Sequence, residues 1–222
     1  MPGAAIFDMD GTLTDTNYLH VVAWWEAFRQ SGHTVPMPDI HRAIGLGSGD
    51  LIQRLLGPDR DREQDGAISA AHTVLYATYF ERLPAFRGAD ILLRTLAGRG
   101  WQVVLATSAS GPELAALRQA VDADEAIRDT ASSDDVDRGK PAPEPVELAC
   151  RLAGVERERA VFVGDTVWDM EAATRAGATA VALLSGGIPR DDLEKSGAAA
   201  VYRDIADLLD RIDDSPFGPD PG

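Results

Sequence analysis

The stretch AAIFDMDGTLTD, at residues 4–15, decides the fold because it joins a strand of buried character to two closely spaced carboxylates. Residues 4–7 are all apolar, which predicts a short strand that is covered on both faces of a sheet. Asp8 ends this run, and Asp10 follows two positions later, before Gly11. Two like charges at the mouth of a buried strand repel each other. Other parts of the chain must therefore supply groups that stabilise these two charges close together.

Further short apolar runs of the same kind alternate with segments of helical spacing. The expected strands are at 101–107, 160–164 and 179–184, and the expected helices are at 112–121, 143–154, 169–177 and 202–212. This alternation of strands and helices predicts an α/β fold with a doubly wound, Rossmann-like parallel sheet.

One long segment interrupts that alternation. Residues 16–83 contain helical patterns and no clear strand, which predicts a helical cap inserted into a core made of 1–15 and 84–214. The glycine-rich turn at 45–50 is expected to face the cleft between cap and core. Residues 215–222 are rich in Pro, Gly and Asp and are expected to form a flexible tail.

Composition excludes several classes of partner. The net charge of −15 argues against nucleic acid and against an anionic membrane surface. No apolar run approaches the ~20 residues of a membrane span, and the first residues lack the basic segment of a signal peptide. We therefore expect a cytoplasmic protein with a small-molecule partner. Cys150 is the single cysteine and is expected to pack in a helix, and the oligomeric state is left open.

Polar side chains follow the expected strands where each strand ends. Asp8 follows the first strand, Thr107 and Ser108 the second, and Asp165 the third, while Lys140 lies in the loop RGKPAP before that third strand. Ligands of doubly wound folds bind at the carboxyl ends of the strands. We therefore expect these side chains to meet at one edge of the sheet.

Such a group of residues suits phosphoryl transfer. Two unit charges ~4 Å apart repel by about 4 kcal/mol at an effective dielectric constant near 20, so Asp8, Asp10 and Asp165 need a cation. Carboxylate oxygens favour Mg²⁺, which also binds substrate phosphates. One carboxylate can attack phosphorus, and a second can exchange a proton with the leaving oxygen. Lys140 adds a positive charge, and hydroxyl groups such as that of Thr107 can donate hydrogen bonds to phosphate oxygens.

Four motifs, in chain order, resemble those of the haloacid dehalogenase superfamily of phosphatases: DMDGTLTDT from residue 8, LATS from 105, GKPAP from 139 and GDTVWDM from 164. The resemblance implies that Asp8 is the nucleophile and Asp10 the general acid and base. It implies that Mg²⁺ is held by Asp8, by the main-chain carbonyl of Asp10 and by Asp165, with Asp169 nearby. Lys140 would hold the nucleophile and the phosphate. The predicted phosphate- or substrate-binding set is Thr107, Ser108, Gly11, Thr12 and His20.

The position of the helical insert resembles the subgroup that contains phosphoglycolate phosphatase and β-phosphoglucomutase. Two interpretations of His20 remain open: it lies at the junction of cap and core near Asp10, or it is an exposed histidine above a buried Trp24. His33, His41 and His72 have no metal-like spacing and are expected at the surface.

The favoured function is a Mg²⁺-dependent phosphatase that acts on a small phosphate monoester, such as a sugar phosphate or a phosphoglycolate-like compound, through an aspartyl-phosphate. A phosphomutase is the nearest alternative. The mutases that this chain resembles carry an arginine in the loop where Gly49 stands, although Arg42 or Arg54 could substitute. A non-enzymatic phosphate sensor, such as a receiver domain, is the other alternative.

Overall fold

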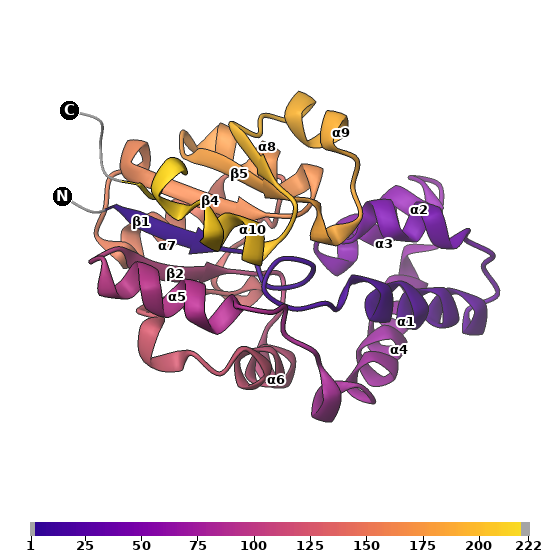
Figure 1. Cartoon of the computed structure of the whole chain (residues 1–222). Coiled ribbons are helices and arrows are strands. Elements are labelled where there is room, and N and C mark those ends of the chain that lie inside the picture. The colour runs from indigo at the N-terminus through magenta and orange to yellow at the C-terminus, as the bar shows by residue number, and fades with distance from the viewer. Residues whose placement is uncertain (1–2, 219–222) are drawn as a thin grey trace.

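A six-stranded parallel sheet, in the order β3-β2-β1-β4-β5-β6, forms the centre of a computed structural model that describes residues 3–218 (Figure 1). The strands are β1 (Ala4–Phe7), β2 (Gln102–Ala106), β3 (Asp129–Ala131), β4 (Ala160–Gly164), β5 (Thr179–Leu183) and β6 (Ala200–Tyr202). The predicted α/β class is confirmed, and the four predicted strands agree with the structure to within a residue at each end. The two outermost strands, β3 and β6, were not predicted.

Helices cover both faces of the sheet, which explains why β1 is apolar at every position. Ala5 and Phe7 pack with the layer of α5 (Ala89–Gly98), α6 (Gly111–Val121) and α10 (Ile205–Asp210). Ala4 and Ile6 point the other way, into the layer of α7 (Glu144–Ala153), α8 (Val167–Ala176) and α9 (Arg190–Lys195). All four side chains are fully buried.

Two of the predicted helices begin elsewhere. The helix α8 starts at Val167, two residues before the predicted start, because Thr166 and Asp169 form a capping box around its first turn. The helix α10 starts at Ile205, since Asp204 accepts a hydrogen bond from the main-chain N–H of Asp207 and so caps the helix. Tyr202, predicted to begin this helix, belongs to β6.

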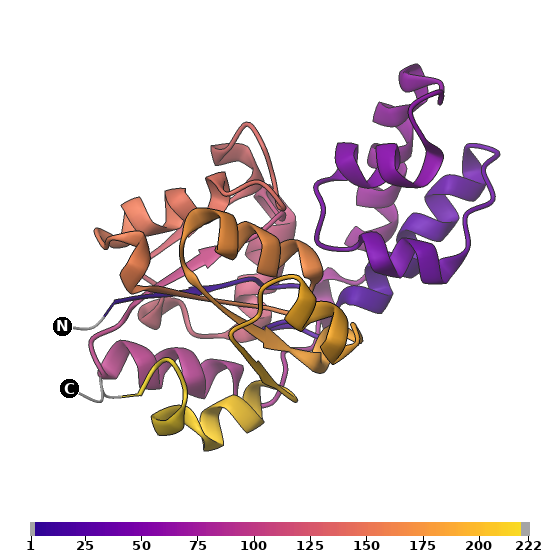
Figure 2. The same ribbon diagram turned by 90° about the horizontal axis from the view of Figure 1, so that it is seen from above.

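Residues 16–83 form four helices with an apolar cluster of their own. These helices are α1 (Asn17–Gln30), α2 (Met37–Ala43), α3 (Ser48–Leu56) and α4 (Asp65–Ala77), followed by a 3₁₀ turn at Phe80–Arg82. Trp24, Phe28, Ile40 and Leu51 are among the buried members of that cluster. Figure 2 shows the four helices as a separate group beside the core. We keep the name cap for residues 16–83.

The predicted flexible tail is wrong for residues 215–218. Phe217 is only 2% exposed, and its ring stacks on Phe7 at 6.2 Å between centroids and meets the edge of Trp101 at 5.1 Å. An aromatic side chain buried in this way holds the segment against the sheet. Residues 219–222, the rest of that prediction, lie outside the described part of the chain.

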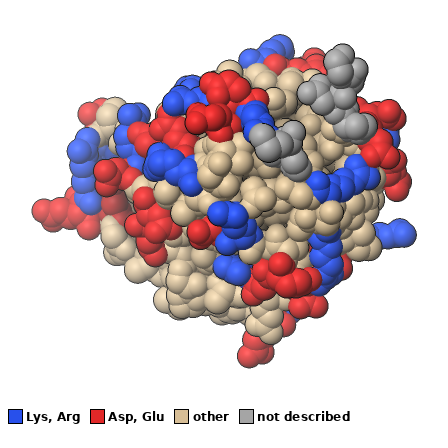
Figure 3. Space-filling model, turned by 90° about the vertical axis from the view of Figure 1, so that its left-hand side faces the viewer, with Lys and Arg blue, Asp and Glu red and all other residues tan. Residues whose placement is uncertain are grey.

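Acidic and basic side chains alternate on the face of the molecule that is turned away from the cap (Figure 3). Among residues 3–218, no helix has both the length and the apolar character that crossing a membrane requires.

Candidate active site

The site lies where the chain reverses its direction of winding across the sheet. From β1 the chain proceeds to β2 and β3 on one side, and β4 then pairs with the other side of β1. Asp8 follows β1, Thr107 follows β2 and Asp165 follows β4, and all three are buried. Ligands of doubly wound folds bind at this switch point. The expected meeting of these side chains is confirmed for Asp8 and Asp165, which join Asp169 in a group whose carboxylate oxygens lie within 4.8 Å of one another.

Lys140 binds two of these carboxylates. Its Nζ lies 2.7 Å from Oδ1 of Asp8 and 2.8 Å from Oδ1 of Asp169, and the residue is 1% exposed. Burial alone would lower the pKa of Lys140, but the charges of Asp169 and Asp8 outweigh that effect and raise the pKa above its usual range. Lys140 is therefore a permanent cation between Asp8 and Asp169.

The loop after β1 orients Asp165. Thr12 donates from its hydroxyl to Oδ1 of Asp165 and Asn17 donates from its side-chain amide to Oδ2, both at 2.8 Å. Gly11 has a φ of +74°, and any Cβ there would overlap Asp165 and Asn17. The main-chain N–H of Gly11 donates to Thr14 O and that of Thr12 to Met9 O. Gly11 and Thr12 therefore help to position Asp165, and their part in phosphate binding stays a prediction.

This group of residues fits a divalent cation. Three buried carboxylates and one ammonium leave two negative charges in excess. Burial raises the pKa of Asp165 well above its usual range, with help from Asp169 and Asp8. Burial also raises the pKa of Asp8 to about 7, although Lys140 opposes the shift. A hard cation that accepts oxygen ligands would supply the missing positive charge.

The Asp10 carboxylate contacts residues of the cap and is not part of that group. Its Oδ1 accepts from Thr16 Oγ1 at 2.5 Å, lies 3.1 Å from Nε2 of His20, and is 3.5 Å from the Tyr76 hydroxyl. Burial would raise the pKa of Asp10, but the charge and hydrogen bond of His20, with the bond from Thr16, lower it overall. Burial would lower the pKa of His20, but Asp10 outweighs this and raises it. Asp10 and His20 thus form an ion pair.

His20 belongs to a stack of side chains at the junction of cap and core, as in the first of the two interpretations made from the sequence. It is 7% exposed, and its Nδ1 lies 3.1 Å from Nε2 of His72. The prediction that His72 lies at the surface is wrong, because its ring stacks on Trp24 at 4.0 Å between centroids. Burial and the charge of His20 lower the pKa of His72 to about 2, so a neutral His72 accepts the Nδ1–H of His20.

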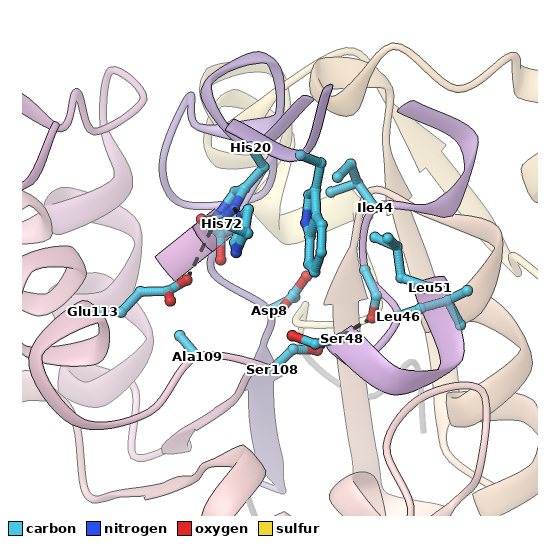
Figure 4. Close-up of a pocket in the computed structure, with 13 residues that line it drawn as sticks. Asp8, His20, Ile44, Leu46, Ser48, Leu51, His72, Ser108, Ala109 and Glu113 are labelled. Carbon is cyan, nitrogen blue, oxygen red and sulfur yellow. Dashed lines mark hydrogen bonds and ion pairs between the residues drawn. The ribbon is translucent and has the colours of Figure 1, made fainter. Parts of the chain in front are cut away.

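Glu113, which sequence analysis missed, faces this stack from the core. It lies in the first turn of α6, and its Oε1 is 3.7 Å from Nε2 of His20 (Figure 4). Burial raises the pKa of Glu113 to about 7, although the charge of His20 opposes the shift. Its position shortly after the end of a strand, in the sequence GPEL, is the signal that could have indicated it.

The residues of the second motif connect the core to the cap. Ser108 donates from Oγ to the Gly45 carbonyl at 3.2 Å, and Thr107 accepts the Ala109 N–H at 3.1 Å. Gly45, with Leu46 and Ser48, lines the pocket above Asp8, so the turn at 45–50 faces this pocket as predicted. Thr107 and Lys140 line a second hollow on the other side of Ser108.

Glu113 predicts a pH dependence of stability. Its pKa rises from 4.5 to about 7 on folding, so the folded state binds this proton more tightly and stability falls as the pH rises through that range. We expect Glu113→Gln to be more stable relative to the parent protein at pH 8 than at pH 5, by roughly 1–3 kcal/mol, since one pKa unit corresponds to about 1.4 kcal/mol. Urea unfolding at the two pH values measures this. Equal differences at both would contradict it.

Buried aspartates and one lysine at the switch point of a doubly wound sheet form a site that α/β hydrolytic enzymes can use. The chain belongs to the haloacid dehalogenase-like hydrolases, whose family model matches residues 2–177. The resemblance predicted from the four motifs and the prediction of an enzyme are thereby confirmed.

Known relatives extend over almost the whole chain. It is 29% identical to phosphoglycolate phosphatase of Rhodospirillum rubrum, over 95% of this chain and 90% of that protein. It is 31% identical to N-acetylmuramic acid 6-phosphate phosphatase of Pseudomonas aeruginosa, over 94% of this chain and 95% of the relative. The crystal structure of a hydrolase from Pseudomonas syringae is similar, with a TM-score of 0.91 and 36% identity over 96% of this chain and 98% of that one.

Proposed function

We propose that the protein is a Mg²⁺-dependent phosphatase that hydrolyses a small phosphate monoester through an aspartyl-phosphate on Asp8. The observation that carries this proposal is the position of Asp8, which lies at a strand end with Lys140 2.7 Å away and with Asp165 and Asp169 gathered beside it. The names of the Rhodospirillum rubrum and Pseudomonas aeruginosa relatives, both phosphatases of small phosphate esters, support the same reaction.

In the first step, a carboxylate oxygen of Asp8 attacks phosphorus and the bond from phosphorus to the leaving oxygen breaks. Asp10 is ionised at rest, so it takes a proton from His20, 3.1 Å away, and passes it to that oxygen. The ion pair of Asp10 and His20 thus supplies the proton. In the second step, water attacks the aspartyl-phosphate, and Asp10 accepts a proton from that water and returns it to His20, which restores the ion pair. Phosphate leaves and Asp8 is regenerated.

The residues that would hold Mg²⁺ are Asp8, Asp165 and, through its main-chain carbonyl, Asp10. When bound, the ion would neutralise charge on the phosphoryl oxygens. Asp169 has other contacts, because its Oδ1 is 2.8 Å from Lys140 and its Oδ2 accepts from the Thr166 N–H and hydroxyl. The role of Asp169 is therefore to hold the Lys140 ammonium in position next to the residues that would bind Mg²⁺.

Phosphate release from p-nitrophenyl phosphate and from small esters, with Mg²⁺ and after treatment with EDTA, tests the proposal. Asp165→Asn should raise the Mg²⁺ concentration for half-maximal rate by at least about tenfold, because a ligand charge is lost. Asp191→Asn, at an exposed aspartate, is the matched control and should leave it unchanged. An unchanged Mg²⁺ requirement in Asp165→Asn, or release that persists in EDTA, would count against the assignment.

The phosphomutase alternative needs a second phosphate-binding group in the cap. Arg42 and Arg54, the two candidates, are exposed and line one hollow formed by cap residues and another that extends to α8 and α9 of the core. The guanidinium of Arg54 lies 4.7 Å from the ring centroid of Trp168. Neither arginine lines the pocket above Asp8, so the proposal is hydrolysis.

A further inference from the structure

The pocket above Asp8 has two unlike walls (Figure 4). The cap contributes the apolar side chains of Trp24, Ile44, Leu46 and Leu51, together with polar residues that include Ser48 and the two histidines His20 and His72. The core contributes Ser108, Ala109 and Glu113 from the segment that follows β2. Because Asp8 lies at the floor, the group that leaves phosphorus must occupy the space between these walls.

The charges that line this pocket are nearly all negative. Asp8, Asp10 and Glu113 are the acids, His20 is paired with Asp10, and none of the described residues that line the pocket is Lys or Arg. The cap arginines make other contacts. Arg29 lies over Trp25, Arg54 over Trp168 and Arg82 over Tyr79, while Arg60 pairs with Asp65. Among these residues, therefore, no unpaired cation is available to bind an anion at the leaving-group end of the pocket.

We propose that the leaving group is an uncharged, hydroxyl-bearing alcohol and that Glu113 is the residue that rejects an anionic one. This inference rests on the proposed function and names its substrate class. The Glu113 carboxylate accepts hydrogen bonds from hydroxyl groups and repels a carboxylate or a second phosphate. The apolar side chains of Trp24, Ile44 and Leu51 cover the carbon skeleton of the alcohol.

This inference predicts a substrate other than the one in the name of the phosphoglycolate phosphatases, because the glycolate that leaves phosphoglycolate carries a carboxylate. Sequence identity of 29% over 95% of the chain would otherwise favour that substrate. The side chain of Glu113 is 21% exposed and close to His20, so its charge acts inside a largely closed site, where electrostatic repulsion is poorly screened.

Two esters of nearly equal size test the inference directly. They are 2-hydroxyethyl phosphate and 2-phosphoglycolate, whose leaving groups differ in charge, and p-nitrophenyl phosphate serves as the reference substrate. At pH 8 with Mg²⁺, we expect kcat/KM for 2-hydroxyethyl phosphate to exceed that for 2-phosphoglycolate by at least tenfold. Glu113→Gln should reduce this ratio by threefold or more, whereas Glu158→Gln, at an exposed glutamate, should not change it.

The possible failures are distinguishable. A kcat/KM for 2-phosphoglycolate equal to or above that for 2-hydroxyethyl phosphate would overturn the inference while leaving the phosphatase assignment in place. A ratio unchanged in folded Glu113→Gln, with folding checked by thermal denaturation, would overturn the part assigned to Glu113. Release from none of the three esters would contradict the proposed function itself.

Discussion

Asp8→Asn is expected to lower Mg²⁺-dependent phosphate release by about 10³- to 10⁶-fold, the loss typical of removing an enzyme's nucleophile. An amide cannot attack phosphorus as a carboxylate does. The substitution keeps the shape of the side chain, and the amide oxygen can still accept from Lys140, which lies 2.7 Å from Oδ1 of Asp8. The fold should therefore survive. Release of inorganic phosphate from 2-hydroxyethyl phosphate, with circular dichroism as a check on folding, measures the effect.

Asp15→Asn is the matched control for this variant. Asp15 lies in the same loop but is exposed, and it is not among the residues that line the pocket above Asp8. We expect its phosphate release to stay within about twofold of the parent protein, since substitutions at such surface positions rarely have large effects. Turnover by folded Asp8→Asn close to that of Asp15→Asn would exclude a phosphorylated Asp8 intermediate.

Lys140→Met is expected to remove activity and also to destabilise the protein by about 3–5 kcal/mol. Methionine has a similar length but no charge, so Asp8 and Asp169 would lose the buried ammonium that lies within 2.8 Å of both. Removing one partner of a buried ion pair leaves an uncompensated charge, which costs about this much free energy. Urea unfolding at pH 8 measures the stability, and phosphate release measures the activity.

The sequence supplies a convenient control, because its only other lysine is Lys195. Lys195 ends α9 and is exposed, so Lys195→Met should change stability by less than about 0.5 kcal/mol. If the two lysine variants unfolded at the same urea concentration, Lys140 would not compensate the charges of Asp8 and Asp169.

Much of the acidic site could be predicted because it depends on sequence features that act locally. Each of Asp8, Thr107 and Asp165 follows an apolar run, and the carboxyl ends of parallel strands meet at one edge of the sheet. The alternation of apolar runs with helical spacing predicts that the runs are strands of one sheet. The meeting of Asp8 with Asp165 follows from the topology, although 157 positions separate them in the sequence.

The residues that sequence analysis missed depend on packing between distant helices. Glu113 lies on α6 of the core, and His72 lies on α4 of the cap, yet both lie next to His20 on α1. No residue spacing within a single segment predicts that Glu113, His72 and His20 come together. His72 was expected at the surface because single histidines without metal-like spacing usually lie there, and only its stacking on Trp24 shows otherwise.

The missed strands have a different cause. β3 and β6 are three residues long and lie at the two edges of the sheet, where one side has no neighbouring strand. Asp129 is exposed and Thr130 is half-buried, so β3 lacks the unbroken apolar run of β1. A periodic pattern cannot be recognised in so few residues. The domain limits at 15, 83 and 214, and the catalytic parts assigned to individual residues, stay predictions.

The burial of Phe217 against Phe7 and Trp101 has a practical consequence for handling the protein. It places the two ends of the described chain together on the side of the sheet opposite the cap (Figure 1). An affinity tag or a surface linker joined at either end would therefore leave the entrance to the pocket above Asp8 unobstructed. Immobilised protein should then turn over small esters as fast as protein free in solution.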